Sequence, residues 1–357
     1  MSVPTAEIEQ YRPWSHRAAL MVACATFPLI WVGGLVTTYD AGMAVPDWPS
    51  TFGYNLFLYP WQSWLAGPWD LFIEHGHRQI GALVGLLAIF LVVTTWGDSR
   101  RWLRVLSIVA LLMVIVQGLL GGQRVLLDDR RIAQLHGCVG PLFFAFAAML
   151  TTFTSRWWTK PTTGAPVDDN RRSVRNLRRL SIAAWIAFGL AVGQLVLGSQ
   201  LRHGVEYSSA AVFRSAVVFH IVFACGLALQ VFVLGIKSMR ARVGGRIGLM
   251  LIALVACQLA LGVGTWAVKY GWPTLLADVF PLPAFTVQAE SMWQSLTVTA
   301  HVAMGSLILA LTGTLAVRLM RLQHVVGVPA SAAVDGRRPS VSDGRLKPVH
   351  QRVGASA

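Results

Sequence analysis

Residues 79–96 read QIGALVGLLAIFLVVTTW, eighteen residues without a single charged side chain. A helix needs about 20 predominantly apolar residues to cross the hydrocarbon core of a bilayer. Arg78 precedes this stretch and Asp98 follows it, so its uncharged length is close to one membrane crossing. Membrane β-strands are shorter and alternate between polar and apolar residues, which this stretch does not. We therefore predict a transmembrane helix here.

The rest of the chain repeats this pattern. The chain is 55% hydrophobic and only 13% charged, with a mean hydropathy of +0.56, whereas a soluble domain carries roughly 25% charged residues. The predicted fold is an all-α integral membrane protein with eight transmembrane helices. The first run is too long for the apolar part of a signal peptide, and we expect it to be the first span. The eight runs are about 17–38, 77–96, 103–122, 133–155, 180–200, 214–236, 245–267 and 294–317.

The positive charges predict the orientation of these spans. The formal net charge is +14, and 23 of the 30 Lys and Arg lie in the termini or in every second loop. Cytoplasmic loops of membrane proteins carry such an excess, so we expect both termini in the cytoplasm. A basic surface that binds nucleic acid would concentrate its charge on one patch, and we expect no nucleic-acid partner.

The two halves of the chain repeat one four-helix unit. Each half begins on the cytoplasmic side, so the repeat is parallel, and we expect two four-helix bundles related by a pseudo-two-fold axis along the membrane normal. The third span ends in Gln117-Gly-Leu-Leu-Gly-Gly, and two later spans end in a similar way from Gln194 and Gln258. The predicted organisation is a cytoplasmic N-terminus at 1–16, an N-terminal half at 17–155, a cytoplasmic linker at 156–179, a C-terminal half at 180–320 and a disordered cytoplasmic tail at 321–357.

Four histidines occupy matching places in the two halves. His77 and His220 lie near the outer ends of the second and sixth spans, and His136 and His301 near those of the fourth and eighth. An ionisable group inside a span is costly, which makes it a functional candidate. Two imidazoles on facing helices of a bundle suit the axial positions of a haem iron. Zinc favours three or four protein ligands, so haem fits better, although hydrogen-bonded core histidines stay an alternative.

One carboxylate distinguishes the two halves. Glu74 stands three residues before His77 and therefore shares its helix face, whereas Val217 holds the matching place before His220. A carboxylate beside a haem could move protons or stabilise positive charge, or it could simply lie at a helix N-terminus, where the dipole favours it. Cations near the outer span ends would suit haem propionates or the membrane interface; they are Arg78, Arg124, Arg131, Arg202 and Arg214.

These residues resemble the haem A synthase family. The resemblance lies in Glu74-x-x-His77-Arg78, in Gly33-Gly34-Leu-Val-Thr-Thr, in Ala41-Gly-Met-Ala-Val-Pro-Asp-Trp-Pro49 and in the four histidines, and it covers about residues 17–320. It implies oxidation of a ring methyl of haem O to a formyl group by two successive hydroxylations, for the assembly of haem-copper oxidases. It further implies that His220 and His301 bind a haem b cofactor and that His77 and His136 flank the substrate haem. Glu74 would be the catalytic carboxylate.

The resemblance also implies partners: a haem O synthase would supply the substrate and an electron donor would complete the reaction. A homo-oligomer is compatible with the sequence. The residues before the first span include Glu7 and Glu9, unlike an Arg-rich, acid-poor mitochondrial transit peptide, so we expect the plasma membrane of a bacterium and not a mitochondrial inner membrane. Many members of that family carry a cysteine pair in the first outer loop, where this chain has Val45 and Thr51. A thiol-based capture of haem is therefore not expected here.

Two other functions fit the same residues. A di-haem b-type cytochrome that passes electrons, for example from quinol, would use the four histidines without needing Glu74. A proton-coupled transporter built from parallel repeats would use histidines and a glutamate as a proton relay without binding haem.

Overall fold

The computed structural model describes residues 11–160, 170–203, 209–271 and 291–327, and within these ranges the chain is helical without a β-strand. Eight of its helices are long and apolar enough to cross a membrane, which confirms the predicted fold class. They are α1 (Pro13–Thr38), α3 (Trp69–Thr95), α4 (Arg101–Leu127), α5 (Arg130–Thr154), α7 (Asn170–His203), α8 (Ala210–Arg240), α9 (Gly245–Tyr270) and α11 (Met292–Gly327). Shorter elements are η1 (Ala41–Met43), α2 (Trp61–Leu65) and α6 (Arg156–Thr159).

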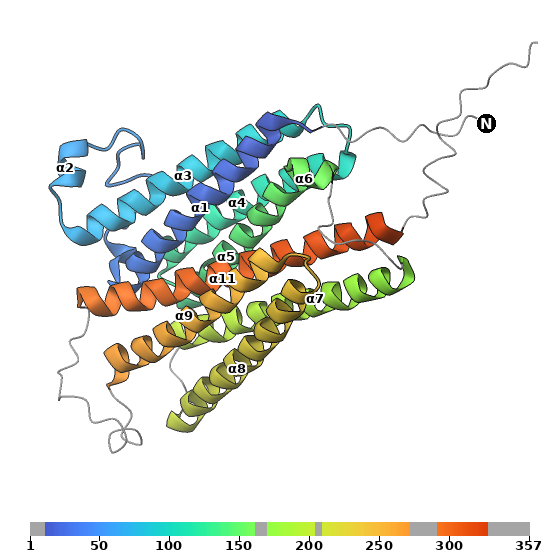
Figure 1. Ribbon diagram of the computed structural model, residues 1–357. Coiled ribbons are helices and arrows are strands. Elements are labelled where there is room, and N and C mark those ends of the chain that lie inside the picture. Colours follow the sequence, from blue (N-terminus) through green and yellow to red (C-terminus); the bar gives the residue numbers. More distant parts are fainter. Residues whose placement is uncertain (1–10, 161–169, 204–208, 272–290, 328–357) are drawn as a thin grey trace, which may run out of the picture.

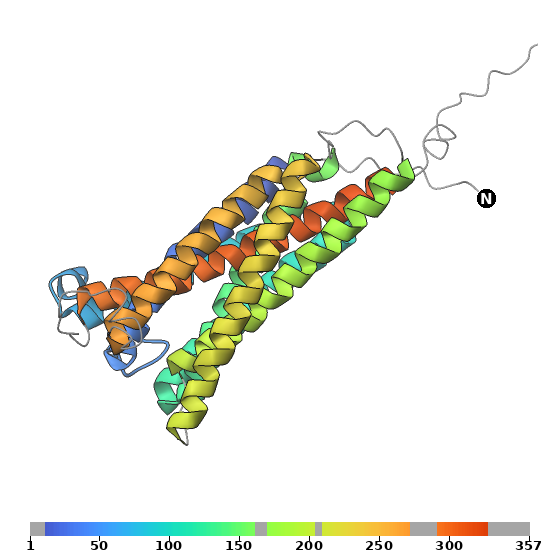
Figure 2. The same ribbon diagram turned by 60° about the horizontal axis from the view of Figure 1, so that its bottom comes forward.

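The helices pack as two groups of four that meet along α11. In the first group, α1 and α4 each contact α3 and α5. In the second, α7 and α9 each contact α8 and α11. The groups join where α11 contacts α1 and α5, and where α5 contacts α7 (Figure 1). Figure 2 shows the same helices after a turn, with α11 still running between the two groups.

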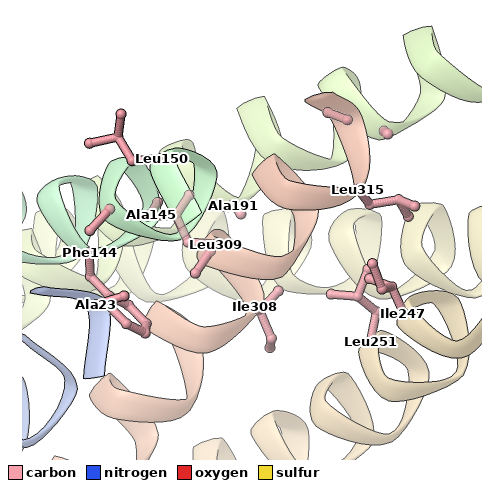
Figure 3. Close-up of a cluster of buried hydrophobic side chains, with 14 of the residues drawn as sticks. Ala23, Phe144, Ala145, Leu150, Ala191, Ile247, Leu251, Ile308, Leu309 and Leu315 are labelled. Atoms are coloured by element: carbon pink, nitrogen blue, oxygen red, sulfur yellow. The ribbon is translucent and has the colours of Figure 1, made fainter. Parts of the chain in front are cut away.

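The core of the molecule surrounds α11. Of its most apolar stretch 61% is buried, against 17% for α4, α8 and α9. Ile308 and Leu309 of α11 pack among small and apolar side chains from α5 and α7, such as Ala145 and Ala191 (Figure 3). The Leu, Val and Phe side chains that stay exposed on α3, α4 and α8 suit contact with lipid tails.

Several helices extend beyond their predicted bounds. α1 begins at Pro13 because proline is well suited to the first turn, where no helical N–H bond is needed. α7 begins at Asn170, inside the predicted linker. α11 continues to Gly327, past the predicted start of the tail, because Leu322 is buried and Arg321 donates to the Trp158 carbonyl at 3.2 Å. The rest of the predicted tail lies outside the described residues.

Candidate functional site

The four predicted histidines meet as two pairs. His77 of α3 faces His136 of α5 with their ring centroids 6.2 Å apart. His220 of α8 faces His301 of α11 at 6.5 Å. In both pairs the ring planes are steeply inclined, at 75° and 63°. The structure thus brings together the residues that the repeat pattern paired, while what they bind stays a prediction.

The spacing within each pair fits one metal ion between two imidazoles. With metal–nitrogen bonds of about 2 Å, two axial imidazoles place their ring centres roughly 6 to 6.5 Å apart. Among the described residues, no group of three or more His, Cys, Asp or Glu side chains gathers to hold a metal ion. Two facing imidazoles therefore match the axial ligands of a haem, whose ring supplies the other four bonds, better than they match a zinc site.

A glycine on a neighbouring helix lies against each histidine ring. A Cβ added to Gly33 of α1 would come within 2.7 Å of Cε1 of His77, and one on Gly121 of α4 within 3.0 Å of Cε1 of His136. The C-terminal half repeats this arrangement: Gly198 of α7 and Gly262 of α9 would each bring a Cβ within 3.3 Å of Cε1 of His220 and of His301. An added Cβ at Gly33 would clash with the His77 ring, and at the other three places the ring would have to shift by a few tenths of an ångström. We call each such position a glycine cradle.

Among the residues that the structure describes, three of the four Nδ1 atoms in the cradles have no hydrogen-bond partner. Nδ1 of His77, His220 and His301 is buried without a hydrogen bond, whereas Nδ1 of His136 lies 3.1 Å from the Gln117 carbonyl oxygen. A buried polar atom left unpaired costs about 1–3 kcal/mol. Three such atoms at matching places indicate rings whose partner is a ligand, and the donor set fits haem iron.

Glu74 is held in place by the first outer loop. Its side chain is buried, with Oε2 accepting from the Val45 N–H at 2.9 Å and Oε1 paired with Arg78 at 2.8 Å. Arg78 in turn donates to the carbonyls of Val45, Asp47 and Ser50 at 2.7, 2.7 and 2.9 Å. Because α3 begins at Trp69, Glu74 lies beyond the first turn, and the interpretation of it as a helix-terminal acid is wrong.

A second anchor joins this loop to α3. Thr51 is fully buried, and its hydroxyl lies 3.1 Å from Nδ1 of His75. His75, to which the sequence assigned no role, also contacts the rings of Tyr59 and Trp64. Val45, through its main-chain N–H, and Thr51, through its hydroxyl, therefore both attach the loop to α3 by hydrogen bonds.

The loop also folds back on itself and reaches α4. Burial acts to raise the pKa of Asp47, but hydrogen bonds from the Gly53 N–H, the Ser50 side chain and the Phe52 N–H outweigh it and leave that pKa below its usual value. The Trp48 indole lies directly against Gly122, where an added Cβ would clash with its ring. Gly122 follows the cradle glycine of His136, so this contact places the loop beside the first histidine pair.

Besides Arg78, two of the candidate arginines lie between the helices near the histidine pairs. Arg202 of α7 donates to the Gly34 carbonyl at 2.7 Å and to the Thr38 hydroxyl at 2.9 Å. Arg124 of α4 reaches Gly42 and lies close enough to interact electrostatically with Glu74. The remaining two, Arg131 and Arg214, are exposed, as interface residues are. Arg124 and Arg202 thus place positive charge beside the two pairs.

Comparison with known proteins agrees with this geometry. Residues 69–215 match the model of COX15-CtaA, described as cytochrome oxidase assembly protein. The chain is similar to the COX15-CtaA family through this segment. The segment contains Glu74, His77 and His136, and it ends before His220 and His301.

Curated proteins that are similar to this chain carry the name "Heme A synthase". The protein of Shouchella clausii is 32% identical over 123 residues, which are 33% of this chain and 38% of that relative. The protein of Halalkalibacterium halodurans is 31% identical over 124 residues, 34% of this chain and 39% of the relative. That of Alkalihalophilus pseudofirmus is 30% identical over 123 residues, with 33% and 39% covered. The match therefore spans less than two fifths of each relative.

A repeated sequence pattern corresponds to the glycine cradles, although the sequence alone did not reveal what the glycines contact. The glycines at the ends of the third, fifth and seventh spans form a repeated pattern, but nothing in the sequence said that each lies against a histidine ring. The regular offset was visible nonetheless: Gln117, Gln194 and Gln258 each stand four residues before a cradle glycine.

Proposed function

We propose that the protein is a haem A synthase, a membrane oxidoreductase that converts a ring methyl of haem O to the formyl group of haem A. The observation that supports this proposal best is the asymmetry of the two pairs. A buried carboxylate, Glu74, lies on the helix face of His77, whereas Val217 holds the same place before His220. An enzyme that uses one haem as substrate and another as cofactor needs chemistry at only one of its two sites.

In this proposal the C-terminal half holds the cofactor. His220 and His301 would hold a haem b, with the cradles of Gly198 and Gly262 positioning their rings. A haem b in this half would supply a one-electron redox centre. The surroundings of the pair support this role, because Val217 and the neighbouring Ile221 bring no ionisable group to it.

The N-terminal half would hold the substrate, with His77 and His136 flanking haem O. Each hydroxylation is a two-electron oxidation that adds one oxygen atom to the methyl carbon. With dioxygen as the oxidant, the electron donor supplies the two electrons that, with two protons, reduce the second oxygen atom to water. Loss of water from the diol formed by the second hydroxylation leaves the formyl group. The carboxylate of Glu74, held by Arg78, would accept a proton from the reacting group or stabilise positive charge that develops there. Arg124 and Arg202 would pair with propionates.

The setting of the reaction belongs to the same proposal. The relatives are bacterial and the eight apolar helices are those of a multi-pass membrane protein, which supports a bacterial plasma membrane. We place both termini in the cytoplasm from the distribution of Lys and Arg. The partners would be a haem O synthase, an electron donor and the lipid bilayer, without nucleic acid.

Extraction and chromatography of haem from the purified protein tests the proposal. The protein would be produced with a haem O supply, as wild type, Glu74→Gln and Asp70→Asn; Asp70 is an exposed acid in the first turn of the same helix. We expect haem A or its hydroxylated precursor, together with haem b, from wild type and Asp70→Asn. We expect only haem O and haem b from Glu74→Gln, with a loss of turnover of about 10²–10⁴-fold.

A di-haem b-type cytochrome is the second candidate, because the two pairs have nearly equal spacings of 6.2 and 6.5 Å. In that case every variant would yield haem b alone, with no oxidised product. A protein that retains no haem at all would contradict both candidates, and the assignment of the four histidines with them.

A further inference from the structure

The first outer loop leaves four large apolar side chains exposed. Phe57, Leu58, Trp61 and Leu65 are 61%, 75%, 64% and 56% exposed, and we call them the loop patch. Residues 39–74 contain four acids and no Lys or Arg. Exposed apolar surface of this kind marks contact with another protein or with a membrane. The level of the loop patch along α3 distinguishes these two partners.

The loop packs on a single face of α3, and α2 lies beside the beginning of that helix (Figure 1). Nε2 of Gln79 donates to the Leu56 carbonyl at 2.7 Å. One turn earlier, His75 contacts the Trp64 ring. Trp64 also stacks on Phe72, and its indole N–H donates to the Phe72 carbonyl at 3.1 Å. Phe72, His75 and Gln79 stand three or four residues apart and therefore share one side of the helix.

Further along α3 the same face is exposed and apolar. Leu83, Leu86 and Phe90 follow Gln79 at steps of four, three and four residues, and each of their side chains is exposed. Gln79 begins the uncharged stretch of eighteen residues, whose length at 1.5 Å per residue is close to the thickness of the hydrocarbon core. The loop therefore covers the outer part of this face, and lipid tails cover the part that follows.

Helix geometry places the loop patch at the level of the lipid headgroups. Leu56 is bonded to Gln79, so Leu58, two residues later, lies next to the boundary of the hydrocarbon core. α2 packs against His75, which stands four residues, or about 6 Å, further out along α3. The headgroup layer is about 5–8 Å thick, so α2 and its Trp61 lie within it. Tryptophan is enriched at this depth.

We propose that the first outer loop is inserted into the membrane, with the loop patch among the lipids of the leaflet on its side. The polar residue Ser63 lies about 200° around α2 from Trp61 and is exposed, so it faces water. Because residues 39–74 contain no Lys or Arg, apolar contact holds the loop there, and attraction to anionic headgroups does not. The proposal does not depend on what the histidines bind.

The bilayer then supports the candidate site together with the helices. The loop reaches Glu74 through the Val45 N–H and is attached to α3 through the Thr51 hydroxyl and through Arg78. These bonds hold the side of the loop that faces the helices. Lipid contact holds the opposite side, so the loop that braces Glu74 is fixed on both.

Spin labels on single cysteines test the depth of the loop patch. The four native cysteines would be replaced by alanine, and Leu58→Cys, Trp61→Cys and the matched control Ser63→Cys would each be labelled in lipid nanodiscs that hold one chain. Oxygen concentrates in hydrocarbon and a nickel chelate stays in water, so the ratio of their collision rates with the label reports depth. We expect this ratio to be several-fold higher at Leu58 and Trp61 than at Ser63.

Two results would overturn the proposal. Equal ratios at all three positions would mean that the loop patch faces water, and a label at Leu58 that neither reagent reaches would mean that protein covers the patch. Should the cysteine-free chain fail to fold, the unmodified chain can be photolabelled by a lipid that carries a diazirine next to its headgroup. Labelling within residues 57–65 would support the proposal, and labelling confined to the eight spans would contradict it.

Discussion

The surroundings of His77 and His220 show how two copies of one framework diverge. Both histidines lie on the second helix of their half, against a glycine of the first helix and opposite a histidine of the fourth. The side chains around them differ at three places: Glu74 against Val217, Arg78 against Ile221, and Leu29 against Gln194. The backbone preserves the position of the ring, while these three differences place an ion pair and a leucine around His77 where His220 has a glutamine and two apolar side chains.

Removing one histidine from each half should have the largest effect, because it tests whether the two halves bind haem independently. We expect His220→Ala to abolish haem b binding in the C-terminal half, since that half would keep a single axial ligand. His77→Ala should leave that haem in place, because the second pair does not depend on it. Haem stoichiometry from the pyridine haemochrome, with reduced-minus-oxidised spectra, measures both. Loss of haem b in His77→Ala would show that the sites are not independent.

Arg78→Ala should have the next largest effect. It leaves the buried Glu74 without its charge partner, and breaking a buried pair in this way costs about 3–5 kcal/mol. Ile221→Ala is the matched control, since Ile221 holds the same place after His220 and is largely exposed. Thermal unfolding in detergent and limited proteolysis of the first outer loop provide the measurement. Equal stability of the two variants would mean that the ion pair does not hold the loop.

The glycine cradles should respond unequally to an added methyl group. A Cβ on Gly33 would come within 2.7 Å of the His77 ring, while one on Gly198 would stay 3.3 Å from that of His220. We expect Gly33→Ala to cost about 1–3 kcal/mol, as overpacking does, and to change the spectrum of the N-terminal haem. Gly198→Ala should cost less. The unfolding temperature and the Soret band of each variant test this order, and the reverse order would contradict it.

The smallest expected effect concerns Asp47, which accepts hydrogen bonds from the Phe52 and Gly53 N–H groups within the first outer loop. The pKa of Asp47 lies below its usual value, so its contribution is present above the unfolded pKa of about 3.9 and is lost as the pH falls through the folded pKa. Asp47→Asn should therefore make the loop easier to cleave at pH 5, and the difference from wild type should vanish near pH 2. Pepsin digestion across this range measures it. A difference that stays constant would indicate that the charge of Asp47 is not involved.

Helical periodicity and apolar length were enough to predict one part of this comparison. The eight spans, the pairing of His77 with His136 and of His220 with His301, and the contrast between Glu74 and Val217 all follow from the order of the residues alone. The partners of Glu74 do not, because Val45 binds it through a backbone N–H, which every residue except proline has. The contact between Gln194 and His220 was equally hidden, since a repeated spacing does not say which neighbouring helix lies opposite.

The way Arg78 holds the first outer loop has a consequence for how that loop can vary. Its three bonds to the loop end on the main-chain oxygens of Val45, Asp47 and Ser50. Side chains at these positions can change without removing an acceptor, whereas inserting or deleting one residue between 45 and 50 would move the oxygens out of register. The bonds from Arg78 therefore require a fixed number of residues between positions 45 and 50, but they do not require particular side chains there.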